Sequence, residues 1–331
     1  MSDFEKMVEA AKQAMIHTMD LKAGEKVLVV TDSRRKTIGE AFARAAEAAG
    51  ASADLYFLPD DRRPLSDIPE DLPPLLEGKN VVINAFVGMA EETPFRIKWI
   101  KKVIEPRNKR LGHAPGITED MMLHGPMNID YAQMKDLVNR MLKAMENARS
   151  AHVTSPAGTD LTLNIEDRGF MTDVFITNEH WGNLPAGEIW CGPHEDGADG
   201  IFVCDGSIGD IGMVKKPLKI TVKKGKIVGL ESVDQTLVEQ VQKLTSVDEW
   251  ASVIGELGIG LNPGARITGN LLEDEKAFHT IHIAFGNNDE MPGGKNPSQT
   301  HRDFLTKDPT LVVTYKDGSQ RTLIKDGIIH V

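Results

Sequence analysis

The chain has 331 residues, of which 40% are hydrophobic and 26% are charged, and its formal net charge is −11. This length predicts two domains, because single hydrophobic cores stop growing near about 250–300 residues. The acidic balance disfavours general binding to nucleic acid, which is typical of basic surfaces. Two cysteines, Cys191 and Cys204, make no disulfide framework, and no apolar run has the length of a membrane span or a signal peptide. We therefore expect a cytoplasmic globular protein with neither a membrane nor a nucleic-acid partner.

The first half of the chain alternates helix patterns with short apolar runs. Apolar residues at three- and four-residue spacing predict a helix over 4–20, and a second helix is expected to end at Gly50. Strands are expected at 27–30, 54–58 and 81–86. This alternation is typical of a parallel sheet with crossover helices. We predict an α/β domain with a parallel sheet over residues 1–150.

Ligand motifs are sparse in this half. The first strand is followed by Thr31-Asp-Ser-Arg-Arg-Lys36, which lacks the glycine-rich turn of dinucleotide sites. Thr118 indicates a helix start. His113 and His124 could join a metal site, but surface or capping positions are the favoured interpretation for both.

From about residue 151 the pattern changes to short strands and tight turns. Strand patterns recur over 152–230 and again over 310–324, and Lys223-Lys-Gly-Lys226 is typical of a hairpin turn. One or two helices are expected within 234–256, with Glu256 at a helix end. We predict a mostly antiparallel α+β domain over residues 151–331, which carries the metal-binding site.

Four side chains of the types that bind divalent metal ions lie within a short stretch of this second half. They are Glu256, His282, His301 and Asp303. In an extended strand His282 points away from the apolar side chains of its neighbours, and His301 and Asp303 point the same way. A His-x-Asp pair of this kind can chelate one ion, or the aspartate can orient the imidazole. The stretch therefore predicts a metal site.

Further carboxylates could complete such a site. Glu188 follows a turn-rich segment, where a carboxylate is expected to be either exposed or functional. Two carboxylates can bridge two cations, which polarise a carbonyl and lower the pKa of a shared water. A third, within Glu273-Asp-Glu275, could serve as general base. The same three acids are also consistent with an ordinary solvated loop, which is the interpretation that we favour.

Eight short motifs follow one another between about residues 110 and 305. They are Pro115-Gly-Ile-Thr-Glu-Asp-Met-Met122, Asp130-Tyr131, Gly158-Thr-Asp-Leu161, Asn183-Leu-Pro-Ala-Gly-Glu188, Asp205-Gly-Ser-Ile208, Glu256-Leu-Gly-Ile-Gly-Leu-Asn-Pro263, Thr280-Ile-His-Ile-Ala-Phe-Gly286 and His301-x-Asp303. In this order they resemble the thermophilic leucyl aminopeptidase family, the aminopeptidase T and aminopeptidase S group (peptidase family M29).

The resemblance implies a homodimeric metallo-aminopeptidase that removes N-terminal residues from peptides with two zinc, cobalt or magnesium ions. Carried over by position, the metal ligands are Glu188, Glu256, His282, His301 and Asp303, with Glu256 also catalytic. Characterised members carry a tyrosine ligand shortly after the strand histidine. This chain has Asn287-Asn-Asp289 there, so that Asp289 becomes an additional candidate ligand.

Two alternatives remain open. A related branch contains mononuclear iron enzymes similar to 2,5-dihydroxypyridine dioxygenase, and His282, His301 and Asp303 could supply the two histidines and one carboxylate that suit Fe(II). Retained Glu188 and Glu256 favour the peptidase, because a single iron needs fewer carboxylates. The missing tyrosine motivates the second alternative, a catalytically silent metal-binding protein on the same fold.

Overall fold

The computed structural model describes residues 1–331 and divides the chain into two compact units. Unit 1 comprises Met1–Gln133 and Asp173–Ala186, and unit 2 comprises Met134–Thr172 and Gly187–Val331. The change of unit thus falls within helix α5 (Tyr131–Met145), and a later segment belongs to unit 1. These boundaries differ from a single break near residue 150, and the division into domains of residues 1–150 and 151–331 stays a prediction. No helix is long and apolar enough to cross a bilayer.

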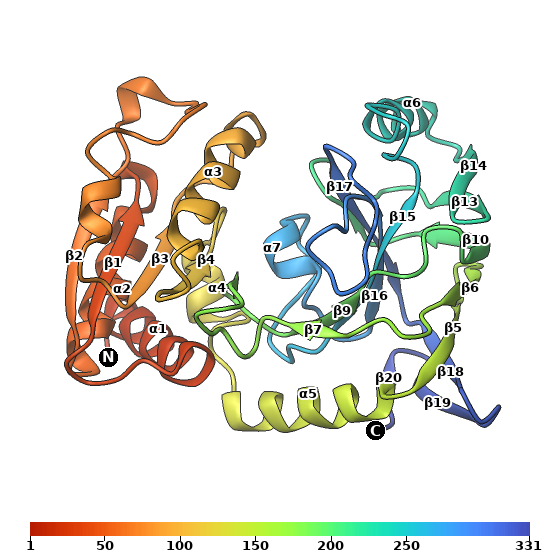
Figure 1. Ribbon diagram of the computed structural model, residues 1–331, viewed down its shortest axis with the longest axis horizontal. Coiled ribbons are helices and arrows are strands. Elements are labelled where there is room, and N and C mark those ends of the chain that lie inside the picture. The colour runs from red at the N-terminus through yellow and green to blue at the C-terminus, as the bar shows by residue number, and fades with distance from the viewer. The chain divides into compact units, whose positions relative to one another are not determined.

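Unit 1 is built on a parallel five-stranded sheet with the order β2-β1-β3-β4-β8 (Figure 1). The strands are β1 (Lys26–Thr31), β2 (Ser52–Phe57), β3 (Val81–Ala85), β4 (Arg110–His113) and β8 (Gly182–Asn183). The helices are α1 (Asp3–Met19), α2 (Lys36–Ala48), α3 (Thr93–Ile104) and α4 (Glu119–Leu123). The predicted parallel α/β architecture is confirmed.

Local side-chain chemistry explains where these helices begin. Ser2 and Glu5 form a capping box at the start of α1, which satisfies amide groups that no helical carbonyl can reach. Thr118 caps α4 by accepting from the Met121 amide at 3.2 Å, as its sequence position predicted. In α2, Gly39 lies so close to β1 that an added Cβ would meet Thr31 at 2.7 Å. The glycine therefore lets helix and sheet pack closely.

The core of unit 1 is apolar on both sides of the sheet. Leu28 and Val30 of β1 belong to a cluster that includes Phe95 and Trp99 of α3. Successive strand residues face opposite sides, so that Val29 belongs to the other face, where α2 packs against β1. Burial of this kind is the main stabilising contribution to folding.

Unit 2 contains two antiparallel sheets (Figure 1). The eight-stranded sheet comprises, in spatial order, β14 (Lys226–Glu231), β13 (Leu218–Lys223), β10 (Ala198–Cys204), β6 (Asp160–Asn164), β5 (Ala148–Thr154), β18 (Thr310–Tyr315), β19 (Gln320–Lys325) and β20 (Ile328–Ile329). The seven-stranded sheet comprises β12 (Gly212–Met213), β11 (Ser207–Ile208), β17 (His301–Lys307), β16 (Thr280–Gly286), β15 (Ile254–Gly260), β9 (Glu188–Cys191) and β7 (Met171–Thr172). Helices α6 (Gln235–Leu244) and α7 (Leu271–Asp274) are insertions. The predicted antiparallel α+β domain is confirmed.

The expected turn between β13 and β14 is also present. Lys224 and Gly225 both have positive φ angles, of 46° and 72°. Two consecutive residues of this kind form the tight turn that matches the twist of a hairpin.

One helix is present within residues 234–256, as predicted, but the expected position of Glu256 at a helix end was wrong. Helix α6 ends at Leu244, and Glu256 lies inside β15, a fully buried central strand. The glycines that suggested a break are needed for packing: a Cβ on Gly260 would meet the Ala277 carbonyl oxygen at 2.1 Å, and one on Gly255 would meet the Gly286 oxygen at 2.5 Å. Tertiary contacts therefore override the low strand preference of glycine.

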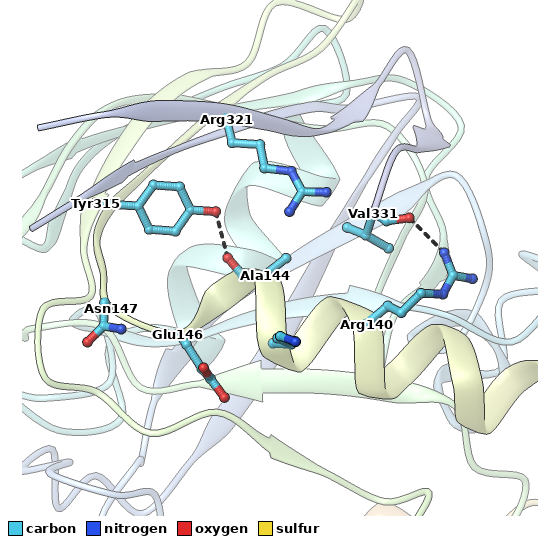
Figure 2. Close-up of a pocket in the computed structure, with 8 residues that line it drawn as sticks. Arg140, Ala144, Glu146, Asn147, Tyr315, Arg321 and Val331 are labelled. Carbon is cyan, nitrogen blue, oxygen red and sulfur yellow. Dashed lines mark hydrogen bonds between the residues drawn. The ribbon is translucent and has the colours of Figure 1, made fainter. Parts of the chain in front are cut away.

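A surface cavity of about 440 Å³ lies against the C-terminal half of α5 and strands β18 and β19. Tyr315 donates a hydrogen bond of 2.8 Å to the Ala144 carbonyl, and Arg140 donates one of 2.7 Å to the Val331 oxygen (Figure 2). None of the candidate metal ligands lines this cavity.

Candidate metal centre

Four neighbouring strands of the seven-stranded sheet carry the five ligands implied by the sequence. Glu188 opens β9, Glu256 lies in β15, His282 in β16, and His301 and Asp303 in β17. Residues paired across an antiparallel ladder share one face of the sheet. The register therefore brings these side chains together although they are far apart in sequence.

Small residues in the ladder make room for the ligands. Ala284 pairs with both Glu256 and Asp303, and lies between them. Gly258 pairs with His282, and a Cβ on Gly258 would lie only 1.8 Å from the Nε2 atom of that imidazole. The His282 ring therefore occupies the space that a side chain at position 258 would need.

The ligand atoms form two groups that share one residue. Glu188, Glu256 and His282 make the first group, and Glu256, His301 and Asp303 make the second, with the candidate atoms of each group within 4.8 Å of one another. Glu256 presents Oε1 to His282 Nε2 at 3.0 Å and Oε2 to His301 Nε2 at 3.2 Å. Its two oxygens thus face two different imidazoles, which is the arrangement of a bridging carboxylate.

Each end of the cluster has a further carboxylate. Glu188 Oε2 lies 3.4 Å from His282 Nε2, and Asp303 Oδ1 lies 3.4 Å from His301 Nε2. The three carboxylates and His282 are buried, whereas the His301 side chain is 32% exposed. The second group is therefore the one that solvent reaches.

The electrostatics of the cluster follow from this crowding. Burial by itself would raise the pKa of Glu256, but hydrogen bonds from His282 and His301 outweigh it and lower that pKa to about 2. Burial would lower the pKa of His282, but the hydrogen bond to Glu256 and the charge of Glu188 raise it to about 9. The charge of Asp303 likewise raises the pKa of His301 against the effect of burial. The surroundings thus strongly favour positive charge at the centre of the cluster.

The orientation of His301 is fixed from behind. Its Nδ1 atom lies 2.7 Å from the Asn287 carbonyl oxygen, so that Nδ1 carries the proton and Nε2 faces the cluster. Asn287 is held in turn by its amide, which donates to the Thr300 carbonyl at 2.7 Å, and by its side chain, which donates to the Ser298 carbonyl at 3.1 Å. A ligand imidazole that donates its other N–H to a carbonyl is typical of metal sites.

These residues fit a divalent cation. Imidazole nitrogen and carboxylate oxygen are ligands of zinc and related ions, and the cluster offers two of the first kind and three of the second. Buried carboxylates are costly unless cations accompany them.

Other sequence candidates lie elsewhere. Asp289 is exposed, its amide donates to the Asn287 side chain, and it belongs to neither ligand group. His124 is exposed, as expected. His113 is 5% exposed, so its expected surface position was wrong: it lies in β4, where Asn84 Nδ2 is 2.9 Å from its Nδ1 atom. Burial lowers the pKa of His113 to about 3.

The acidic segment after Asn270 is also different from the prediction. The solvated-loop interpretation was wrong, because Glu273 and Asp274 are buried. Glu273 pairs with Arg266 at 2.9 Å, and Asp274 accepts from the Thr268 and Gly269 amides. These contacts join residues that are close in sequence. The residue types alone, however, do not distinguish this buried acidic segment from a solvated acidic turn.

Sequence reasoning missed Lys276. Its side chain is completely buried, and Nζ donates to Glu188 Oε1 at 3.0 Å and to Glu275. The one available signal was a lysine directly after three acids, which is ambiguous because such charge runs are common on surfaces.

The fold and the cluster together define a candidate metalloprotein with a parallel α/β unit and an antiparallel metal-binding unit. Residues 129–328, more than half of the chain, match the model of the thermophilic metalloprotease (M29) family. The chain belongs to this family.

Two curated proteins and two solved structures are similar to the chain. It is 22% identical over 265 residues to aminopeptidase AmpS of Bacillus subtilis, covering 73% of this chain and 61% of that protein. It is 28% identical over 177 residues to 2,5-dihydroxypyridine 5,6-dioxygenase of Pseudomonas putida, covering 48% and 49%. The chain thus spans about half to three-fifths of the length of these relatives.

The structural likeness extends over the whole chain. The 2,5-dihydroxypyridine dioxygenase from Pseudomonas putida KT2440 has a TM-score of 0.77 at 17% identity, covering 100% of this chain and 98% of that one. Wild-type AmpT from Thermus thermophilus has a TM-score of 0.66 at 16% identity, covering 99% of both chains. At these identities the comparisons show a shared fold.

Proposed function

We propose that the chain is a metal-dependent aminopeptidase that hydrolyses N-terminal residues from peptides at a dinuclear centre. The observation that carries the proposal is the position of Glu256, whose two carboxylate oxygens face the Nε2 atoms of two different histidines. Membership of the M29 family and the similarity to aminopeptidase AmpS support the same activity.

The five candidate ligands would form two ion positions. Glu188 and His282 would hold one ion, His301 and Asp303 the other, and Glu256 both. Bound there, two divalent ions would polarise the scissile carbonyl and lower the pKa of a water molecule. Glu256 is the catalytic residue of this proposal because it fixes both positions at once.

A further carboxyl group that could transfer a proton in such a reaction has one structural candidate. Of the three acids at 273–275, Glu275 shares Lys276 with the ligand Glu188. Burial raises the pKa of Glu275 to about 8 against the lowering effect of the Lys276 charge, with the negative charges of Glu188 and Asp303 acting in the same direction as burial. A carboxyl group with a raised pKa is suited to general acid–base work near neutral pH.

A second candidate function is cleavage of a dihydroxypyridine ring by a single Fe(II). The fold similarity to the Pseudomonas putida dioxygenase favours it. It would use His282, His301 and Asp303 around one ion. Against it, the ligand atoms form two groups that share Glu256 rather than one group of two histidines and an aspartate.

Metal content and turnover together test these candidates. Metal-free protein is reconstituted separately with zinc, cobalt and ferrous iron, and assayed with aminoacyl amides and with 2,5-dihydroxypyridine. Two zinc or cobalt ions per chain with release of free amino acids are expected. One tightly held iron with ring opening would replace the proposal by the dioxygenase. Binding of metal without turnover of either substrate would leave the silent metal-binding protein.

The proposal includes a homodimer, peptide substrates and a cytoplasmic location. Sedimentation velocity of the reconstituted protein tests the first of these expectations, and the amide screen tests the second.

A further inference from the structure

Lys276 is among the largest fully buried side chains of the protein, although lysine is rarely found completely buried. It follows α7, in the connection that leads from β15 to the histidine strand β16. Its Nζ atom donates a 3.0 Å hydrogen bond to Glu188 Oε1 and a second hydrogen bond to Glu275. An ammonium group is costly to remove from water unless it is paired, so the two carboxylates determine where it lies.

This contact divides the two oxygens of Glu188 between different partners. Oε1 accepts from Lys276, whereas Oε2 lies 3.4 Å from His282 Nε2, in the first ligand group. Lys276 thereby directs one oxygen of Glu188 toward the histidine and occupies the other. It also donates a hydrogen bond to the side chain of Glu275.

The second ligand group has no such cation. Asp303 pairs with His301 at 3.4 Å, and no lysine or arginine forms an ion pair with it. A positive charge therefore adjoins a ligand of the first group and none of the second. Like charges in a low-dielectric interior repel strongly, so this asymmetry affects how well each group holds a cation.

We propose that Lys276 is a positioning residue that orients Glu188 as a one-oxygen ligand and weakens the Glu188–His282 ion position relative to the His301–Asp303 position. The inference rests on the proposed dinuclear centre. The position of His301 and Asp303 fills first, and the position of Glu188 and His282 fills second, with affinities about 10- to 100-fold apart, the range of effects of groups that contact metal ligands.

The test is a cobalt titration of metal-free protein, followed by visible absorption and by metal content per chain. Wild-type protein is expected to fill in two separate steps. In Lys276→Met the positive charge beside Glu188 is lost, so the second step tightens toward the first. The metal-free variant also loses thermal stability, which cobalt restores, because a bound cation now compensates the buried carboxylates.

Three further variants make the result specific. Lys276→Arg keeps the charge and is expected to keep the two steps apart. Lys276→Met with Glu275→Gln removes the lysine and one of its partners together, and keeps the test available if the single variant does not fold. Lys79→Met removes a mostly buried lysine that pairs with Asp54 in unit 1, and is expected to leave both cobalt steps unchanged.

The possible failures are distinguishable. Two equal steps in the wild type, or the same separation in Lys276→Met as in the wild type, would overturn the inference and leave the dinuclear centre standing. No uptake of cobalt by the wild type would overturn both. Two cobalt ions in the expected order without hydrolysis of any aminoacyl amide would overturn the proposed peptidase activity and support the role of Lys276.

Discussion

At the scale of single residues, Glu256 is where the two ligand groups meet. Glu256→Gln keeps the shape of the side chain but replaces one oxygen by an amide nitrogen that cannot bind a cation. We expect the variant to stay folded, to lose at least one ion, and to lose most of the proposed aminopeptidase activity. Metal analysis, circular dichroism and initial rates are the measurements. Wild-type metal content and rate in Glu256→Gln would show that Glu256 is not a shared ligand.

The two histidines His301 and His113 provide a second comparison at this scale. His301 Nε2 lies 3.2 Å from Glu256, whereas His113 packs between Phe86 and Trp181 in unit 1. His301→Ala is therefore expected to reduce metal affinity by at least about tenfold, the lower end for loss of groups at metal sites. His113→Ala should cost stability and leave metal affinity unchanged. Equal losses of metal in both variants would contradict the assignment.

At the scale of elements, the sequence predicts the architecture well and the central strand poorly. The extended conformation assumed for the segment around His282 and for His301-x-Asp303 agrees with β16 (Thr280–Gly286) and β17 (His301–Lys307), whereas their antiparallel pairing was not predicted. Strand β15 was missed because both of its faces are buried, so no alternation of polar and apolar residues marks it. Its glycines are required by neighbours that are distant in sequence. Local patterns cannot report such contacts.

The same limit applies to the candidate site. The sequence predicts the side-chain types and, through the family resemblance, all five candidate ligands, and the sheet brings these five side chains together. It predicts neither Lys276 nor the burial of the acids before it, because charge runs look alike on a surface and in a core. The register of the strand ladder determines which charged side chains come together, and register is a property of the folded sheet.

The close packing of Gly258 in β15 against His282 leads to a prediction about metal affinity. Gly258→Ala places a Cβ 1.8 Å from the present position of His282 Nε2, so the imidazole must shift out of the cluster. Metal affinity is expected to fall about 10- to 100-fold. The matched control is Gly229→Ala in β14, where the added Cβ would meet Thr221 at 3.5 Å, an ordinary contact. Isothermal titration with zinc compares the two. Equal affinities would mean that the ring adapts and that Gly258 is not required.

At the scale of the whole molecule, the two units respond differently to acid. His113 in unit 1 is buried beside Asn84, whose Oδ1 accepts from the Trp99 indole at 2.9 Å. The Nδ2 group of Asn84 therefore donates to His113 Nδ1, and a protonated His113 would oppose one donor with another. In unit 2 the carboxylates raise the pKa of His282 to about 9. The protonated His282 therefore contributes fully to the free energy of unfolding below pH 6.5, and this contribution is lost as the pH rises through about 9. Below pH 6.5 the contribution of His282 is therefore constant.

The lowered pKa of His113 predicts how the free energy of unfolding changes in acid. Burial lowers the pKa of His113 to about 3 from an unfolded value of 6.5. Because the unfolded chain binds the proton and the folded chain does not, the free energy of unfolding falls as the pH drops from 6.5 toward 3, by about 2 kcal/mol at pH 5. Urea unfolding of metal-free protein at pH 7 and pH 5 measures this change, and His113→Gln is the control. The variant should be less stable at pH 7 yet lose about 2 kcal/mol less than the wild type between the two pH values. The same pH dependence in both proteins would mean that His113 titrates normally and that its buried hydrogen bond to Asn84 does not keep it neutral.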